Sequence, residues 1–225
     1  MRGVAALPQL ACDRMMPMWV ARAYGLPPGL GVVRWSWLTA TARGKKRHQV
    51  WWVGWSLAEA SLPPRVVRHG LLLSVARYLL GVEPGIWDAL AVREVRQGAT
   101  RRTEWGREWV KREWRSLRGV SRPDAEWWRS GGPPWPPTAV EVDTGKIPMD
   151  LYRARVETWR PVYPAFLVVT TSRSRAESWR EMLSQMPDFR DLLVRPTAAV
   201  VALAGWWHEG ATLVVVWSTR RGFPK

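Results

Sequence analysis

The alternation of apolar and polar positions divides the chain into blocks with helical or strand periodicity. Over residues 8–23, apolar residues return every three or four positions, which predicts one amphipathic helix. The proline-rich segment 26–29 ends this helix. Two runs of strand-like composition follow, at 32–38 and 50–55, and a basic turn at 41–48 joins them. The N-terminal part is therefore predicted to be a helix followed by a β-hairpin.

A second pattern begins after Pro63 and Pro64, which mark a boundary between a region at 1–64 and a region at 65–225. Helices are predicted at 69–80, 104–117, 148–160 and 174–186, the last with a Ser174/Glu177 capping box, and strands at 89–96, 120–128, 138–143, 165–171, 198–203 and 213–217. The continuously apolar runs among them are typical of strands buried on both faces. This order of elements predicts an α/β domain with a mixed sheet flanked by helices.

The N-terminal helix and hairpin are arranged like the end of a winged helix-turn-helix domain. The tip of the hairpin carries Arg43, Lys45, Lys46 and Arg47. In a winged domain the helix enters the major groove and the wing contacts backbone phosphates. The first helices of a complete winged domain are missing, so we predict a partial winged-helix-like region whose basic tip binds nucleic acid. An ordinary hairpin with a solvated turn is the alternative.

Three carboxylates stand out in the second region. Asp124 follows Pro123 at the start of a predicted strand, and Glu141 and Asp143 lie two residues apart in the next strand. Side chains two apart in a strand point to the same face. If the two strands are neighbours, the three carboxylates converge, and hard cations such as Mg²⁺ bind such oxygen clusters. A solvated strand face is the alternative reading of Glu141 and Asp143.

Two further residues fit phosphodiester chemistry at such a cluster. Lys146 lies just past the strand and could neutralise charge on a phosphate or orient a water molecule. Glu94, in an earlier predicted strand, could complete the site as a distal carboxylate. Asp124, Glu141 and Asp143 are then the metal ligands, and together with Lys146 they are the candidate catalytic residues.

Composition adds a partner to this picture. The 225 residues carry a net charge of +15, which comes mainly from arginine. Arginine binds phosphate in a bidentate manner, so nucleic acid is the polyanion we expect, although GC-rich coding also raises arginine content. Cys12 is the only cysteine, which excludes an internal disulfide and fits a reducing cytoplasm. No apolar run reaches the roughly 18 residues of a membrane span, so no membrane association is expected.

These features together resemble the restriction-endonuclease-like, or PD-(D/E)xK, superfamily. Within it the chain is most similar to the replication-relaxation and plasmid-mobilisation proteins of bacterial mobile elements. The matching pieces are His69 with its apolar helix, Glu94, Pro123-Asp124, Glu141-Val142-Asp143, the Tyr152-containing helix and the strand 166–171. The resemblance spans about residues 30–220. It implies an N-terminal winged helix, a restriction-endonuclease-like domain, DNA as substrate and Mg²⁺ as cofactor.

One position departs from the superfamily pattern. Active members usually carry a lysine two residues after the strand glutamate, where this chain has Asp143. Lys146 would have to reach back from the start of the following helix, as it does in some members.

Three hypotheses follow. The first is a DNA-binding protein of a mobile element whose nuclease-like domain cleaves DNA with Mg²⁺. The second is a catalytically inactive DNA-binding scaffold in plasmid replication control or mobilisation, which acts as a homodimer or with replication or mobilisation partner proteins. The third is a protein-interaction component with an exposed tryptophan patch. The tryptophans considered for that patch are Trp127, Trp128, Trp135, Trp206 and Trp207.

Overall fold

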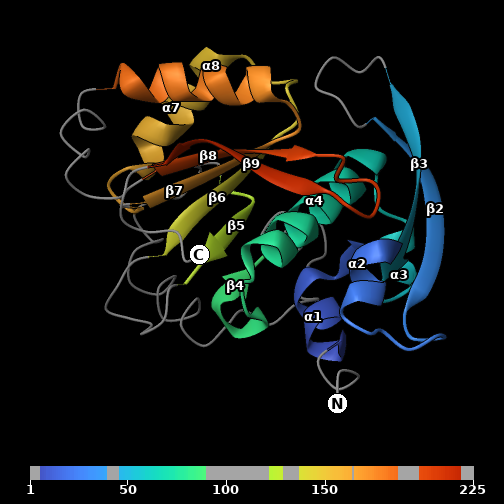
Figure 1. Ribbon diagram of the computed structural model, residues 1–225. Coiled ribbons are helices and arrows are strands. Elements are labelled where there is room, and N and C mark those ends of the chain that lie inside the picture. The colour runs from blue at the N-terminus through green and yellow to red at the C-terminus, as the bar shows by residue number, and fades with distance from the viewer. Residues whose placement is uncertain are drawn as a thin grey trace.

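Two β-sheets and the helix between them organise the molecule (Figure 1). The computed structural model describes residues 6–39, 46–89, 122–128, 137–163, 165–186 and 198–218. Helix α4 (Pro64–Leu80) lies between the N-terminal elements and the larger sheet, and one hydrophobic cluster runs across all three. The domain boundary at Pro63 and Pro64 stays a prediction. Helix α4, which starts there, packs against residues of both the region 1–64 and the region 65–225.

The larger sheet has six strands in the order β4-β5-β6-β7-β8-β9. These strands are β4 (Trp87–Asp88), β5 (Ala125–Trp127), β6 (Thr138–Asp143), β7 (Ala165–Thr170), β8 (Ala198–Ala204) and β9 (Thr212–Ser218). The β6–β7 and β7–β8 pairs are parallel and the other pairs are antiparallel. The predicted α/β class with a mixed sheet flanked by helices is confirmed.

Both faces of this sheet are covered by helices, because its central strands are apolar on both sides. Val140 and Val142 of β6 belong to the cluster that contains α4. Ala139 belongs to a second cluster, formed with α7 (Met149–Trp159) and α8 (Arg173–Ser184). In β7 the same alternation places Leu167 and Val169 in the first cluster and Phe166 and Val168 in the second, which explains the continuously apolar run in the sequence there.

The N-terminal part differs from the single helix predicted at 8–23. Two helices, α1 (Ala6–Asp13) and α2 (Met18–Ala23), flank a short strand, β1 (Met15–Pro17). Arg14 ends α1 in the left-handed region with φ 66°. β1 then pairs with β3 (Arg47–Gly54), which also pairs with β2 (Val32–Thr39) to complete a three-stranded antiparallel sheet. Non-local strand pairing therefore overrides the helical periodicity.

The contacts of Arg14 show how this break is held. Its guanidinium donates from Nε and one terminal nitrogen to Glu59 Oε1, at 2.9 and 2.8 Å. Glu59 is completely buried in the short helix α3 (Leu57–Ala60), where it also forms a capping box with Ser56. The chain thus passes from α1 into β1 against a fixed ion pair that lies 45 residues away in sequence.

The ends of two other helices also differ from the predicted positions. α4 begins five residues before the predicted start, because Pro64 occupies its first position, where proline is favoured. It ends at Leu80 and is capped by Gly81, whose φ of 66° is the left-handed conformation that glycine adopts readily. For α8, the residue that caps the N-terminus is Ser172, not Ser174, and its hydroxyl accepts from the Arg175 amide.

Some predicted elements lie outside the described residues, and one predicted strand is shorter than expected. The helix at 104–117 and all but the first residue of the strand at 89–96 lie outside. Of the strand predicted at 120–128, the described part has strand geometry only at Ala125–Trp127. Within the ranges given above, no helix combines the length and the apolar composition needed to cross a bilayer.

The tryptophan patch of the third hypothesis does not form as predicted. Trp127, Trp128 and Trp206 are buried in the two hydrophobic clusters. Trp207 is only partly buried and stacks on His48, while Trp135 lies outside the described residues. These indoles pack inward because their strands and turns supply core positions, so most of the proposed surface is interior.

Candidate functional site

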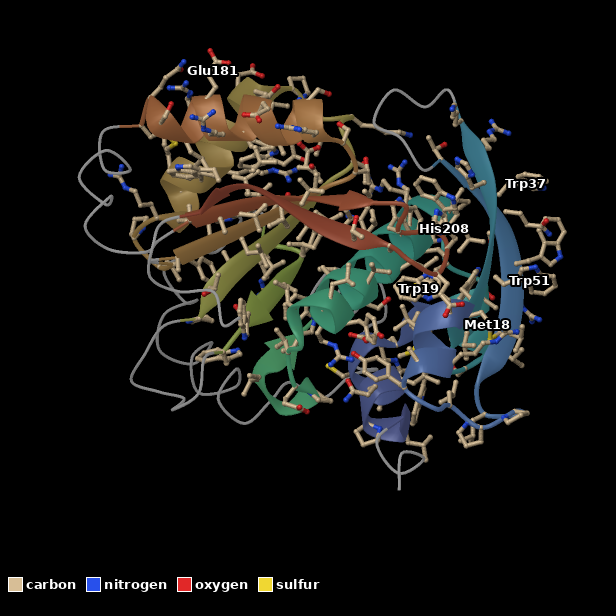
Figure 2. The ribbon with its side chains drawn as sticks, in the orientation of Figure 1. Met18, Trp19, Trp37, Trp51, Glu181 and His208 are labelled. Atoms are coloured by element: carbon tan, nitrogen blue, oxygen red, sulfur yellow. The ribbon has the colours of Figure 1, made fainter. Side chains whose placement is uncertain are left out.

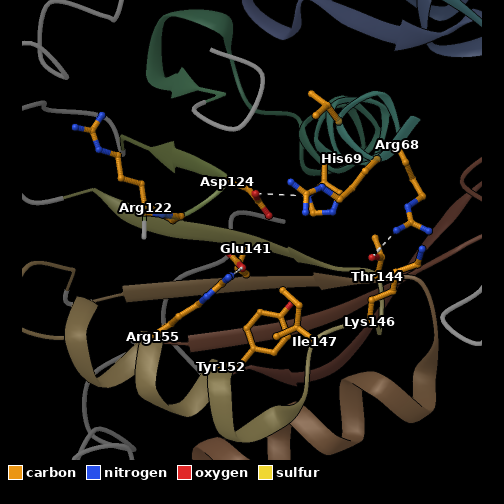
Figure 3. Close-up of a pocket in the computed structure, with 13 residues that line it drawn as sticks. Arg68, His69, Arg122, Asp124, Glu141, Thr144, Lys146, Ile147, Tyr152 and Arg155 are labelled. Carbon is orange, nitrogen blue, oxygen red and sulfur yellow. Dashed lines mark hydrogen bonds and ion pairs between the residues drawn. The ribbon is translucent and has the colours of Figure 1, made fainter. Parts of the chain in front are cut away.

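A cavity of about 320 Å³ opens where the start of α4, the start of β5 and the C-terminal end of β6 meet. Two carboxylates, Asp124 and Glu141, are among the residues that line it (Figure 3). Six basic side chains also line it: Arg65, Arg68, His69, Arg122, Lys146 and Arg155. The cavity therefore combines an acidic pair with a cationic wall.

Asp124 is positioned by both neighbouring elements. Its Oδ2 accepts a hydrogen bond of 2.7 Å from the Val142 amide of β6. Its Oδ1 lies 3.5 Å from Nδ1 of His69, which α4 carries into the cavity (Figure 3). The backbone bond ties the orientation of the carboxylate to the sheet and leaves its other oxygen beside the imidazole.

Glu141 is buried, with 5% of its surface exposed. Oε1 accepts from Arg155 of α7 at 3.0 Å, whereas Oε2 has no hydrogen-bond partner among the described residues. Burial raises the pKa of Glu141 well above its ordinary value; Asp124 and Asp143 add to the rise and Arg155 opposes it. The site thus holds a carboxyl group that is costly to ionise unless another positive charge joins it.

Asp143 shares the strand face of Glu141, as expected from the pleat, but it does not line the cavity. Its Oδ1 accepts from the Gly145 amide at 2.6 Å and from the Tyr152 hydroxyl at 3.2 Å. Its Oδ2 accepts from Arg175 Nε and from Trp179 Nε1, the latter at 2.6 Å. Four donors therefore occupy both oxygens, and Asp143 joins the end of β6 to α7 and α8.

The three predicted ligands are thus separated into a pair and a neighbour. Asp124 and Glu141 line one cavity, whereas Asp143 accepts from the Tyr152 hydroxyl and does not line it. Burial and, as the next largest cause, the charge of Asp143 raise the pKa of the Tyr152 hydroxyl. Tyr152 therefore stays protonated and donates to Asp143. Across the described ranges, no group of three His, Cys, Asp or Glu side chains is placed to hold a metal ion. The convergence of all three carboxylates on one cation is not seen in this arrangement.

Arg68 is a site residue that the sequence did not reveal. It is buried, and one terminal nitrogen donates to Thr144 Oγ1 at 2.8 Å. Its Nε has no hydrogen-bond partner in the described part of the chain. Burial lowers the pKa of Arg68, because its charge is poorly solvated. An anion in the cavity would relieve that cost. Helical periodicity alone placed the start of this helix after Arg68, so no signal connected it to the acids.

The other predicted residues are placed as follows. Lys146 lies on the cavity wall and is exposed to solvent. Lys46 and Arg47 are exposed at the start of β3 and do not line the cavity. Glu94, Arg43 and Lys45 lie outside the described residues.

The donor set of the cavity suits Mg²⁺ as well as phosphate. Mg²⁺ is usually held by one or two carboxylates and completes its shell with water and substrate phosphate oxygens. Asp124 and Glu141 supply two carboxylates, and the unpartnered Oε2 of Glu141 is the kind of buried oxygen that a cation satisfies. The basic residues around them match a phosphodiester.

Glu141→Gln is expected to stabilise the protein at neutral pH. The pKa of Glu141 is higher in the folded protein than in the unfolded chain. The stabilising contribution of its protonated form is therefore fully present below the ordinary carboxyl pKa of 4.5 and is lost as pH rises through the folded pKa. Glutamine keeps an acceptor for Arg155 and removes this loss, a gain of about 1 kcal/mol or more. Urea unfolding from pH 4 to 8 measures it, with the exposed Glu157→Gln of α7 as control. An unchanged pH profile in Glu141→Gln would contradict the raised pKa.

Comparison of the chain with models of known protein families, with curated proteins and with solved structures gives no match. The functional argument therefore depends on the geometry of the cavity. Its two carboxylates, its buried arginine and its basic wall are the observations from which a function has to be derived.

Proposed function

We propose that this is a DNA-binding protein with a nuclease-like site, in which the cavity receives a DNA phosphate for Mg²⁺-dependent cleavage. The observation that carries the proposal is the pairing of Asp124 and Glu141 within a wall of basic side chains. In a protein of net charge +15, an acidic pair at a basic cavity needs a specific explanation. A cation held by the two acids, with a phosphate against the basic residues, accounts for both.

Each residue has a role that follows from its contacts. Asp124 and Glu141 would hold the cation, and the Val142 amide keeps Asp124 in place. When bound, Mg²⁺ polarises the phosphoryl group and lowers the pKa of a bound water molecule. Arg68 and Lys146 bind the non-bridging phosphate oxygens and stabilise their developing charge. His69 beside Asp124 can accept a proton from the attacking water.

The finer classification of the fold belongs to the same proposal. The succession of β5, β6, α7, β7, α8 and β8 is consistent with a restriction-endonuclease-like core. The β2–β3 hairpin, which follows α1 and α2 in the sequence, is consistent with a partial winged-helix-like region whose basic tip contacts DNA. We place the protein in the replication or mobilisation of a mobile element. It would act in the cytoplasm, with partner proteins or with a second copy of itself.

A second candidate is a DNA-binding scaffold that does not cut. The network around Asp143 favours it, because the residue at the superfamily's lysine position is held by four donors. Glu141 is also already paired with Arg155. Such a cavity would bind a phosphate without a complete catalytic set. The two candidates differ in whether plasmid DNA is nicked when Mg²⁺ or Mn²⁺ is present.

Binding of DNA through the cavity is expected to respond to salt. The exposed Arg65 and Lys146 line the cavity, and each phosphate contact they make releases counterions. Arg65→Gln and Lys146→Gln should each lower the slope of log K against log salt by about 1. Fluorescence anisotropy of labelled duplex over a salt series measures this slope. Arg180→Gln, on the exposed side of α8, is the matched control, and equal slopes in all three variants would remove the cavity from the interface.

A further inference from the structure

The outer face of the β2–β3 hairpin presents three tryptophans to solvent. Trp35, Trp37 and Trp51 are 51%, 58% and 51% exposed. Trp35 lies directly opposite Trp51 in the strand register, and the ring centroids of Trp35 and Trp37 are 6.5 Å apart. Figure 2 shows Trp37 and Trp51 pointing away from the body of the molecule. Large indoles in such a cluster are unusual on a surface that serves no partner.

The opposite face of the hairpin fixes this surface in place. Leu38, Val50 and Trp52 are buried in the hydrophobic cluster that includes α4. Trp52 Nε1 donates to Ser36 Oγ at 3.2 Å, and His48 stacks on Trp207 with 4.2 Å between ring centroids. The three exposed indoles are therefore carried by a sheet that is anchored from behind, and their positions do not depend on a partner.

Charge indicates what this face binds. Arg47 lies two residues before Gln49 and four before Trp51, so it shares their face, and both it and Lys46 are exposed. Neither strand contains an aspartate or a glutamate. Aromatic rings beside a cation suit single-stranded nucleic acid, because bases stack on the rings while the cation holds a phosphate. In a duplex the base faces are already stacked, so the same rings would find no partner there.

We propose that Trp35, Trp37 and Trp51, with Arg47 beside them, form a base-stacking platform for single-stranded DNA. The platform is separate from the cavity and binds strand that is open, whereas the cavity receives a phosphodiester. The inference depends on the proposed function only in that the partner is DNA. It assigns the tryptophan surface to nucleic acid and leaves protein association as an outcome that the test can reveal.

The test compares single-stranded with duplex DNA. Binding of a labelled oligothymidine of about 12 nucleotides is measured by anisotropy, and a duplex of equal length is measured in parallel. Trp35→Ala and Trp51→Ala should each weaken single-strand binding about tenfold and leave duplex binding within about twofold. Trp51→Phe should keep most of the affinity, because it retains a ring. Leu57→Ala, which removes an apolar side chain from α3 that is even more exposed than the tryptophans, should change neither affinity.

Two results would overturn the platform. One is single-strand binding that does not change in the alanine variants while their thermal unfolding matches the wild type. The other is self-association of the wild type that the same variants abolish, with no oligothymidine binding at all. Failure of the platform is distinct from failure of the cavity: loss of cleavage in Asp124→Asn with unchanged Trp51→Ala binding removes only the platform. Tryptophan-dependent binding by a protein that never cleaves removes only the nuclease proposal.

Discussion

Asp124→Asn is expected to reduce Mg²⁺-dependent nicking of supercoiled plasmid by about 10²–10³-fold, the scale of loss when one group that stabilises a transition state is removed. Asparagine keeps an oxygen that can accept from the Val142 amide, so the end of β6 should stay as it is. What it removes is the negative charge that Asp124 contributes beside Glu141. Gel electrophoresis of nicked and supercoiled DNA over time measures the rate, and Glu141→Gln should lose activity on the same scale.

The neighbouring Asp143 separates a chemical role from a structural one. Asp143→Asn cannot accept from all four of its donors in the same way, so it is expected to lower the melting temperature as well as the rate. Asp124→Asn should lower the rate alone. Glu157→Gln, exposed on α7, serves as the control that changes charge without touching the cavity. Nicking by Asp124→Asn and Glu141→Gln at the wild-type rate would reject the catalytic assignment.

A third outcome would favour the scaffold. If the wild type nicks no DNA with Mg²⁺ or Mn²⁺ but binds it with a steep dependence on salt, the cavity is a phosphate-binding site only. Isothermal titration of Mg²⁺ into wild type and Asp124→Asn then decides whether a cation enters at all. The pH dependence of that binding has a definite sign: ligation requires ionised Glu141, whose pKa is raised, so affinity should increase as pH rises.

The central sheet was predictable because its signals are local. Strands predicted at 138–143, 165–171 and 198–203 agree with β6, β7 and β8 to within a residue at each end. β7 and β8 are runs of mainly apolar residues buried on both faces, whereas β6 alternates apolar residues with Glu141 and Asp143, and a turn ends it. Neither distant contacts nor unusual backbone geometry are needed to recognise such a strand.

The prediction of one N-terminal helix was wrong because the contacts that decide the structure there are made with residues distant in the sequence. The periodicity at 8–23 is helical, but Met15 pairs with Gly54 and Arg14 binds Glu59. Strand pairing and a buried ion pair outweigh the small intrinsic preference of a few residues for helix. Nothing within a window of helical length carries this information.

The candidate site divides in the same way. Strand alternation correctly put Glu141 and Asp143 on one face, since the pleat has a fixed period. The separation of their roles depends on Arg175 and Trp179, which come from a helix more than thirty residues further on. Arg68 and Arg155 enter the cavity from α4 and α7, and only the packing of those helices against the sheet brings them there.

Helix α4 connects the cavity to the stability of the N-terminal region. Its first half carries Arg68 and His69 to the cavity, and its last turn carries Arg77 to Asp13 at the end of α1. Arg77 donates from Nε and a terminal nitrogen to the two oxygens of Asp13, at 2.8 and 2.7 Å. A third bond of 2.7 Å reaches the Val82 carbonyl just past the helix. Both side chains are buried, at no more than 1% exposure.

Arg77→Met is therefore expected to destabilise the protein by about 3–5 kcal/mol, because it leaves Asp13 buried without its partner. Burial raises the pKa of Asp13 and Arg77 opposes the rise, so in the variant Asp13 should take up a proton and the deficit should grow with pH. Urea unfolding at pH 5 and pH 8 measures both effects, with the exposed Arg22→Met of α2 as control.

The double variant Asp13→Leu/Arg77→Met tests the cause of that loss. Since it removes both charges and fills the site with apolar side chains, it should recover much of the stability that Arg77→Met loses. If the double variant is as unstable as the sum of the two single variants, the cost lies in lost packing and not in an unpaired charge. A preserved melting temperature in Arg77→Met would mean that the ion pair between Arg77 and Asp13 contributes little to the stability of the protein.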